Sequence, residues 1–418
     1  MRTLNHVYAF AIASRLTTIT IAILSYLTTG TYDSSADIQL ASSSLIQRCL
    51  SVFLRWDALY FVHIARQGYI YEQEHAFFPG LPLVSRYLAQ TVFSPIKTYL
   101  GEQHTIILAG ALVTNISFIL AAGSLFKLTR SIFPGYPQLA IISSIAFCLS
   151  PPSMFMSALY TESPFALLSF TGMLWYSQKH YLGASILWGL ASSIRSNAIV
   201  YSGFFMYDLI LRRIGKCTMI TGLIRSILYT AITLSGYTAV QYYGYLEYCP
   251  ERPWCTQTIP MIYSFVQKEY WNNGFLAYYE VKQIPNFLLA LPIISLTVVG
   301  LWKYAQYDWL WFCSLGFLSS KDQVKEPTMS YSSRRAAPFM YLWGLLLLYA
   351  VTCMHVQVII RFFTALPPLY WFTAQLWING FGKQGKIMQQ WISKIVLSYY
   401  VLYGLVGIVL FAAFLPPA

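Results

Sequence analysis

The sequence predicts an all-α polytopic membrane protein, a helical bundle whose chain crosses the bilayer many times. Hydrophobic residues make up 57% of the 418 residues and charged residues only 10%, and the mean hydropathy is +0.53. A soluble domain carries about a quarter charged residues. Apolar segments of about 20 residues, the length that crosses the hydrocarbon core of a bilayer, recur along the chain. Because no repeat or soluble domain interrupts them, we expect residues 1–418 to form a single membrane-embedded domain.

The crossings follow from the positions of the apolar segments. We expect them near 6–29, 106–126, 138–158, 163–177, 182–194, 197–211, 226–243, 286–302, 338–358, 362–379 and 395–415. The first segment follows a single basic residue and is long enough to span, so we predict a retained signal anchor. The 182–194 and 197–211 pieces are short and flank Arg195, which predicts tilted or broken helices. The apolar stretch 308–319 is too short to cross alone.

The distribution of charge predicts the orientation of the chain and excludes nucleic-acid binding. The short segments on one side, with the N-terminus, hold 16 Lys and Arg against 3 Asp and Glu, whereas segments 30–105 and 244–285 hold 8 against 10. Cytosolic loops carry the excess of Lys and Arg. We therefore place 30–105 and 244–285 on the far side of the membrane. The net charge of +12 is spread over loops between spans, so no free basic surface is available to a nucleic acid.

Two cysteines share the second far-side segment. Cys249 and Cys255 stand in "YCPERPWC", and no histidine or second cysteine pair accompanies them, which argues against a zinc site. A disulfide between them is the expected state if that side is oxidising, as the lumen of the endoplasmic reticulum is. Two free thiols are the alternative.

Ionisable residues gather at the far-side ends of the apolar segments. Asp57 lies in the first far-side loop, Glu162 at a turn, Arg195 between two short spans, and His355 and Arg361 near the ends of theirs. Such residues are costly at membrane depth and are therefore functional candidates. A structural ion pair or a side chain that reaches the interface is the alternative for each. Asp208 and Arg212, four residues apart near the cytosolic side, are better explained as a structural pair.

This combination of residue types favours an enzyme that acts at the membrane surface. One carboxylate beside an apolar bundle suits a general base, Arg and His suit a phosphate, and interfacial Trp and Tyr suit a sugar or a lipid headgroup. Together they predict glycosyl transfer from a lipid-linked phosphosugar. A lipid or lipid-linked sugar transporter, or a scramblase, is the alternative. Transporters, however, tend to show internal repeats and midplane ionisable residues, and the sequence shows neither.

Several long and unusual blocks follow one another between about residues 50 and 370. They are "RWDALYFVHIARQGYIYEQEHAFFPGLPL", "ALYTESPFA", "SSIRSNA", "YCPERPWC", "YWNNGFLAYYEVKQIPNFLLALP" and "HVQVIIRFF". Together these blocks resemble one known family, the PIG-V mannosyltransferases. The resemblance implies a GT-C-type glycosyltransferase of the endoplasmic reticulum membrane. It would add the second mannose, α1,6-linked, to the growing glycosylphosphatidylinositol (GPI) glycan from dolichyl phosphate mannose. It further implies a luminal active site and an inverting displacement.

The resemblance also assigns expected roles to individual residues. Asp57 is expected to be the general base, with Arg55 keeping it charged, whereas Glu72 and Glu74 are weaker base candidates. The resemblance leaves open which of the matched residues contact the donor and which contact the acceptor. We hypothesise that Arg361 and His355, helped by Arg195, neutralise the donor phosphate. The expected substrate-binding residues are Arg55, Trp56, Glu162, Asn197, Trp271, Asn272, Tyr279 and Gln357. For Trp271, Asn272 and Tyr279, which would line the acceptor groove, packing of the far-side loop is the alternative.

The same resemblance bears on cofactors and partners. No metal or other cofactor is expected, because no aspartate pair or histidine cluster has the spacing of metal ligands. The expected partners are the lipid-linked sugar donor, the GPI-precursor lipid and the membrane. A small membrane partner subunit stays an open alternative, since fungal members of the family are thought to work with one.

Overall fold

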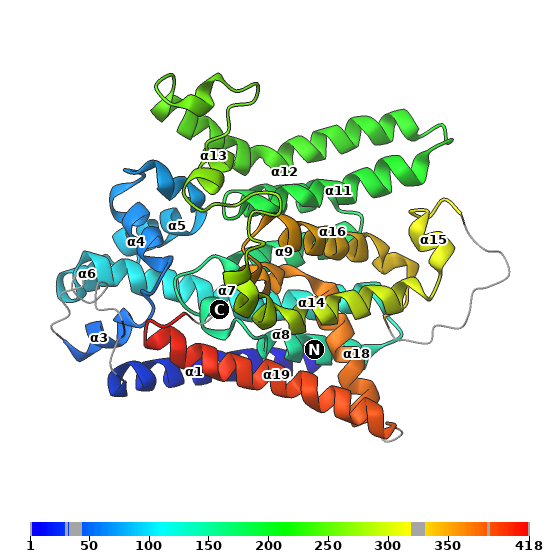
Figure 1. Ribbon diagram of the computed structural model, residues 1–418, viewed down its shortest axis with the longest axis horizontal. Coiled ribbons are helices and arrows are strands. Elements are labelled where there is room, and N and C mark those ends of the chain that lie inside the picture. The colour runs from blue at the N-terminus through cyan, green and yellow to red at the C-terminus, as the bar shows by residue number, and fades with distance from the viewer. Residues whose placement is uncertain (1, 30–31, 33–43, 319–330, 383–384, 417–418) are drawn as a thin grey trace.

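The computed structural model describes residues 2–29, 32, 44–318, 331–382 and 385–416. Throughout these residues the regular structure is helical, with no strand, which confirms the all-α prediction (Figure 1). Six of the described helices are long and apolar enough to cross a membrane. They are α1 (Arg2–Thr28), α7 (Glu102–Ile132), α12 (Met219–Tyr248), α14 (Ile284–Ala305), α16 (Ala337–Cys353) and α19 (Ile387–Ala412). The chain is therefore a multi-pass membrane protein.

The remaining apolar segments form helices of 4 to 16 residues, shorter than these six. They are α8 (Pro137–Cys148), α9 (Glu162–Ser177), α10 (Tyr181–Ser192), α11 (Ser202–Phe205), α17 (Ile359–Phe362) and α18 (Pro367–Phe381). The prediction of one crossing over 138–158 is wrong, because α8 ends before Pro151 and Pro152, which lack the N–H of a continuing helix. Likewise α18 begins at Pro367 rather than 362. The expected break around Arg195 is confirmed: α10 ends at Ser192, and only short 3-10, α and π turns follow it up to Arg213.

Helix α7 lies at the centre of the bundle. It packs against α1, α8 and α9. Helix α10 packs between α9 and α12, and α18 packs between α8 and α19. Glycines allow the closest of these approaches: a Cβ on Gly189 of α10 would lie 2.6 Å from the Ile232 oxygen of α12, and one on Gly236 would lie 2.4 Å from the Gly189 oxygen. Small residues at helix contacts are typical of membrane bundles, where close backbone packing replaces the hydrophobic effect.

Most of the shorter polar segments lie at one end of the bundle, which we call the loop face. It carries α3 (Leu45–Ser51), α4 (Ala58–Gln67), α5 (Gly80–Gln90), α6 (Ser94–Leu100) and α13 (Ile262–Glu269). In Figure 1 these helices occupy the left end, and α15 (Trp309–Cys313) lies at the opposite end. Helix α15 contains five residues, in agreement with the prediction that 308–319 does not cross. The two segments placed on the far side by their charge therefore share one face of the molecule.

Candidate active site

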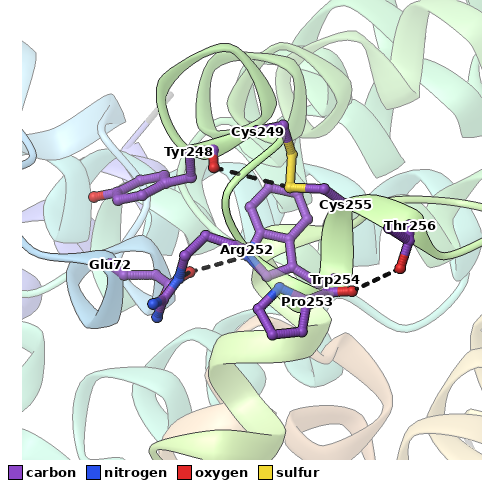
Figure 2. The surroundings of a disulfide bond; sticks show 8 residues. All are labelled: Glu72, Tyr248, Cys249, Arg252, Pro253, Trp254, Cys255 and Thr256. Carbon is purple, nitrogen blue, oxygen red and sulfur yellow. Dashed lines mark hydrogen bonds and ion pairs between the residues drawn. A yellow bond between two sulfur atoms is a disulfide. The ribbon is translucent and has the colours of Figure 1, made fainter.

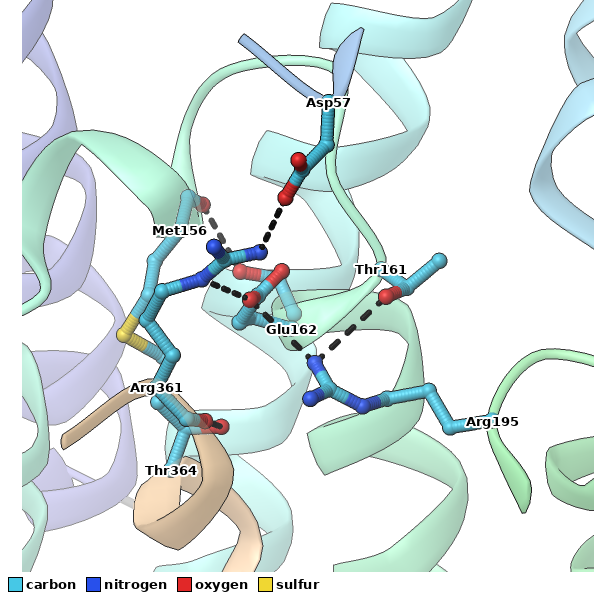
Figure 3. Close-up of polar contacts among 8 residues, drawn as sticks. Asp57, Met156, Thr161, Glu162, Arg195, Arg361 and Thr364 are labelled. Atoms are coloured by element: carbon cyan, nitrogen blue, oxygen red, sulfur yellow. Dashed lines mark hydrogen bonds and ion pairs between the residues drawn. The ribbon is translucent and has the colours of Figure 1, made fainter. Parts of the chain in front are cut away.

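Four charged side chains from four separate segments meet at the loop face (Figure 3). Arg361 donates from Nη2 to Asp57 Oδ2 at 3.1 Å and from Nε to Glu162 Oε1 at 2.8 Å. Arg195 Nη1 approaches the same Glu162 oxygen at 3.2 Å. The prediction that these four residues converge on one face is confirmed. Two carboxylates and two guanidinium groups leave the cluster without net charge.

Each of the four residues stands where a helix begins, ends or is interrupted. Asp57 directly precedes α4, and Glu162 is the first residue of α9. Arg195 follows the end of α10 in an extended conformation, and Arg361 lies in the single turn of α17. A polar side chain at a helix end can meet other segments without disturbing the hydrogen bonds within a helix. These breaks explain how a bundle of apolar helices places charges together.

A sharp backbone turn aims Asp57 at the cluster. Trp56 has a φ of 55°, a left-handed conformation that is uncommon for a residue with a side chain. The turn is held by the hydroxyl of Tyr160, which donates to the Arg55 carbonyl at 2.9 Å. The Trp56 ring packs on Phe414 with ring centroids 5.1 Å apart. Trp56 therefore acts here as a packing residue beside the site.

The two carboxylates differ in their access to solvent. The Glu162 side chain is 0% exposed, whereas that of Asp57 is 29% exposed. Of the two carboxylate oxygens of Asp57, only Oδ2 accepts a hydrogen bond from another described residue. A general base has to meet the proton that it removes, so Asp57 fits this role and Glu162 does not. Glu162 instead fixes the positions of the two arginines.

The guanidinium groups are held by aromatic faces as well as by carboxylates. Arg361 lies over Phe155 and Tyr160, at 4.3 and 4.9 Å from the ring centroids, and Arg195 lies 5.8 Å from that of Phe165. Such contacts stabilise a cation that is partly removed from water. Arg361 bridges two carboxylates, whereas Arg195 contacts one. Arg195 therefore keeps more capacity to bind an incoming anion.

The cluster opens into a cavity of about 150 Å³ at the loop face. Its lining combines the charged groups with aromatic side chains and consists of Asp57, Phe61, Ala76, Phe77, Phe78, Thr161, Ile194, Arg195, Ser196, Asn197, Tyr263, Met354, Arg361 and Phe362. Asn197 is therefore one of the cavity residues. Glu162, behind the arginines, does not line the cavity. A cavity with one accessible carboxylate, two cations and aromatic walls can accommodate part of a phosphosugar.

The expected partnership between Arg55 and Asp57 is replaced by that of Arg361 and Asp57. The side chain of Arg55 is fully buried, donates to the Leu54 carbonyl at 3.0 Å, and lies 4.8 Å from the ring centroid of Tyr26. Because of the turn at Trp56, the side chains of Arg55 and Asp57 point in different directions. Residues two apart in sequence therefore face different environments.

His355 and Gln357 belong to a second polar group rather than to the cavity lining. The His355 ring stacks on Tyr278 with centroids 4.5 Å apart, and the Tyr278 hydroxyl donates to Gln357 Oε1 at 2.8 Å. Asn286 Nδ2 also donates to the Tyr278 hydroxyl, at 2.8 Å. This group joins the end of the second far-side segment to the segment that carries Arg361.

The residues predicted in the second far-side segment differ in their surroundings. Trp271 packs on Tyr60 and on the cavity residue Phe77, with ring centroids 6.3 and 5.8 Å apart. Asn272 is exposed. Tyr279 is half exposed and packs on Phe287. Of the three, only Trp271 contacts the cavity wall.

The disulfide expected between Cys249 and Cys255 is present (Figure 2). The nearby Glu72 accepts hydrogen bonds from Arg252, Trp254 and Tyr270. Burial alone would raise the pKa of Glu72, but these bonds outweigh it and hold the pKa below its ordinary value. Since all these donors engage its oxygens, Glu72 is a poor base candidate.

Glu74 is similarly engaged, with its own set of partners. It is buried, pairs with His63, and accepts from the backbone N–H groups of Ile70 and Tyr71 at 2.9 and 3.0 Å. Both alternatives to Asp57 are therefore occupied by structural contacts.

Several residues near the site were not foreseen from the sequence. Thr161 accepts from Arg195 at 3.5 Å, and the Ser196 hydroxyl donates to that of Tyr263 at 2.9 Å. Phe77 and Phe78 could have been found, because they lie in the block that contains Asp57. Tyr263 could not, since nothing in its local sequence distinguishes it from other loop tyrosines.

The whole chain matches known proteins of one kind. A family model described as mannosyltransferase (PIG-V) matches residues 4–418. "GPI alpha-1,6-mannosyltransferase 2" of Cricetulus griseus is 30% identical, over 99% of this chain and 98% of that protein. The human protein of the same name is 30% identical over 89% of each chain. "GPI mannosyltransferase 2" of Schizosaccharomyces pombe is 31% identical, over 91% of this chain and 76% of its own.

Solved structures show a weaker likeness. The oligosaccharyltransferase AglB of Archaeoglobus fulgidus aligns with a TM-score of 0.48 and 11% identity. The alignment covers 96% of this chain and 55% of that one, so the chain spans about half the length of the archaeal protein.

Proposed function

The chain belongs to the PIG-V mannosyltransferase family, and from this premise we propose that it adds the second mannose, in α1,6 linkage, to a GPI precursor. As a member of that family it is a membrane-bound glycosyltransferase. The proposed donor is dolichyl phosphate mannose, and the proposed place is the luminal face of the endoplasmic reticulum membrane. The observation that carries the proposal is the cavity in which accessible Asp57 lies beside Arg195 and Arg361.

Asp57 is the base in the proposed reaction. The acceptor hydroxyl oxygen attacks C1 of the donor mannose while the bond from C1 to the phosphate oxygen breaks. The hydroxyl proton passes to Asp57, and dolichyl phosphate leaves. One displacement converts the β-linked donor into an α-linked product, so the reaction inverts and needs no covalent enzyme intermediate. A single accessible carboxylate, 29% exposed, supports this scheme, because inversion requires one base.

The arginines stabilise the charge that develops on the leaving phosphate. Arg195 is the principal phosphate ligand in the proposal, because it lines the cavity and contacts only one carboxylate. Arg361 orients Asp57 through its hydrogen bond to Oδ2 while presenting the rest of its guanidinium to the phosphate. Preorganised cations at the point where charge develops lower the barrier. His355 stacks on Tyr278 and supports the segment behind Arg361.

The loop face is the luminal side in this proposal. Two independent features support it: the loop-face segments lack the excess of Lys and Arg that cytosolic loops carry, and they contain the disulfide between Cys249 and Cys255. Disulfides persist on the oxidising side of the membrane. The proposal uses the lipid-linked donor and acceptor and the membrane, and includes no metal or other cofactor. A small membrane subunit is not required by the scheme.

Loss of the protein tests this function in cells. Cells without the chain should accumulate a GPI precursor that carries one mannose, and the wild-type chain should restore the two-mannose product. Purified chain should also convert the one-mannose lipid when given dolichyl phosphate mannose. A transporter or scramblase, the alternative class, would not transfer mannose to the acceptor lipid in detergent solution. Accumulation of a different precursor would refute the proposed step.

A further inference from the structure

Glu72 joins the two loop-face segments through a set of converging donors. Arg252 donates to it from Nε, at 2.9 Å to Oε1, and from Nη2 to Oε2. Trp254 Nε1 donates to Oε1 at 2.9 Å, and the Tyr270 hydroxyl to Oε2 at 3.0 Å. All three partners lie 180 to 198 residues further along the chain. Both oxygens of a single buried carboxylate are thus held by the other segment.

A disulfide stabilises the loop that supplies two of these donors (Figure 2). The bond between Cys249 and Cys255 closes a loop of which Arg252 and Trp254 are part. Trp254 is fully buried and packs with Ile262 and Val266 of α13. A loop that is closed by a disulfide and anchored by a buried side chain loses less conformational freedom on binding a partner than a loop without the disulfide. The donors are therefore preorganised for Glu72.

The contact reaches the wall of the cavity. Glu72 begins a 3-10 turn that ends at Ala76, and Ala76, Phe77 and Phe78 line the cavity. From the other segment Trp271, directly after Tyr270, packs on Phe77. The aromatic wall formed by Phe77 and Phe78 is consequently joined to the second far-side segment at two points, through Glu72 and through the contact of Phe77 with Trp271.

We propose that Glu72 is a positioning residue for substrate binding, which together with the disulfide-closed loop 249–255 holds the aromatic wall of the cavity against its charged side. The inference rests on the proposed function, because the wall is taken to contact the lipid-linked sugar. Glu72 touches no reacting atom in this scheme and acts through Phe77 and Phe78. Release of the loop widens the cavity and weakens substrate binding without removing the base.

Substitution of Glu72 separates this role from a general structural one. Glu72→Gln keeps the shape of the side chain and removes the charge that Arg252 binds. We expect the KM for the one-mannose acceptor or for the donor to rise about tenfold, with kcat changed less than about twofold. The matched control is Glu280→Gln, which removes an exposed ion pair with Lys282 in the same segment. Equal KM values in the two variants, or a fall in kcat alone, would overturn the inference.

The disulfide provides a second test, whose first measurement needs no Glu72 variant. Cys249→Ser combined with Cys255→Ser should raise the same KM, and adding Glu72→Gln should cause little further increase, because both act through one contact. Tyr270→Phe, which removes a single hydroxyl, should shift this KM in the same direction by a smaller factor. Additive effects would overturn the inference. If wild-type chain transfers no mannose, the proposed function fails; if it transfers normally and no variant changes KM, only this inference fails.

Discussion

Arg361 Nη2 lies 3.1 Å from Asp57 Oδ2, joining residues 304 positions apart in the sequence. The same guanidinium donates to Glu162 at 2.8 Å, so one cation fixes an accessible and a buried carboxylate together. Removal of a partner from such a pair leaves an uncompensated charge, which is strongly destabilising when that charge is buried. This arrangement fixes the direction of the Asp57 side chain through the same guanidinium that holds Glu162.

Asp57→Asn should abolish mannose transfer while leaving the protein folded. The amide has nearly the same shape and can still contact Arg361, but it cannot accept the proton of the acceptor hydroxyl. We expect kcat to fall by about 10²–10⁴-fold, the usual contribution of a general base. The measurement is transfer to a one-mannose acceptor by the purified full-length chain. Glu269→Gln, an exposed carboxylate of the loop face, is the control and should transfer normally. Near-normal transfer by Asp57→Asn would exclude Asp57 as the base.

Arg195→Ala should weaken use of the donor more than use of the acceptor. Arg195 lines the cavity and is 20% exposed, so its loss removes a cation from the position proposed for the phosphate. We expect the KM for dolichyl phosphate mannose to rise about 10-fold or more, since hydrogen bonds to charged groups are stronger than neutral ones. Initial rates at varied donor and fixed acceptor concentrations, and the reverse, provide the two constants. Arg86→Ala, at an exposed site on α5, is the matched control. An equal change in both constants would argue for a structural role.

The sequence was sufficient to identify all four members of the charged cluster. Asp57, Glu162, Arg195 and Arg361 stand out because a charge beside an apolar span is costly, and loop charge placed all four on one side. Which cation contacts Asp57 could not be predicted, since it depends on contacts between distant segments. Arg55, its neighbour in the sequence, is directed elsewhere by the left-handed turn at Trp56.

The helix breaks could be predicted only in part from the sequence. The same holds for the side chains that form hydrogen bonds with the backbone at these breaks. Proline pairs mark the end of α8 and the start of α18. The residues that satisfy the exposed backbone at such a break, however, come from distant helices. Arg15 is an example. The sequence predicts α1 only as a membrane anchor, whereas in the structure Arg15 of α1 is hydrogen-bonded to Cys148 and Ser153, where the chain breaks after α8.

Arg15→Leu should destabilise the bundle. Arg15 is buried within α1 and donates to the carbonyl oxygens of Ser153 at 2.9 Å and Cys148 at 3.3 Å. Cys148 is the last residue of α8, and Ser153 begins the short 3-10 turn Ser153–Met156 that follows it, so Arg15 joins α1 to both sides of this interruption. An unsatisfied carbonyl in the membrane costs about 1–3 kcal/mol. We therefore expect a clearly lower midpoint of thermal unfolding in detergent.

The neighbouring residue provides the control for Arg15. Leu16 is 61% exposed on the same helix, and Leu16→Ala should leave the unfolding midpoint nearly unchanged. Arg15→Lys should fall between the two, because an ammonium group can reach one carbonyl but lacks the fork of the guanidinium. An unfolding midpoint of Arg15→Leu equal to that of Leu16→Ala would show that the buried cation contributes nothing to stability.

His75 should make the protein less stable in mild acid. Its ring is fully buried and stacks on Tyr69 with centroids 4.2 Å apart. Burial lowers the pKa of His75 to about 4, against the opposing influence of Glu72 and Glu74. In the unfolded chain the pKa is about 6.5, so between these values the unfolded state binds a proton that the folded state excludes. The contribution to stability is complete above about pH 6.5 and is lost as the pH falls towards 4.

The size of the effect follows from linkage and can be isolated with one substitution. Between pH 7 and pH 5 the free energy of unfolding should fall by about 2 kcal/mol through this group. His75→Phe preserves a stacked ring but cannot titrate, so its unfolding midpoint should change less between the two pH values than that of the wild type. His180→Phe, at an exposed histidine, should behave like the wild type, which removes the general effect of losing a histidine. If His75→Phe and the wild type lose the same stability on acidification, the buried ring is not the group that responds, and the carboxylates around it would carry the acid sensitivity of the loop face.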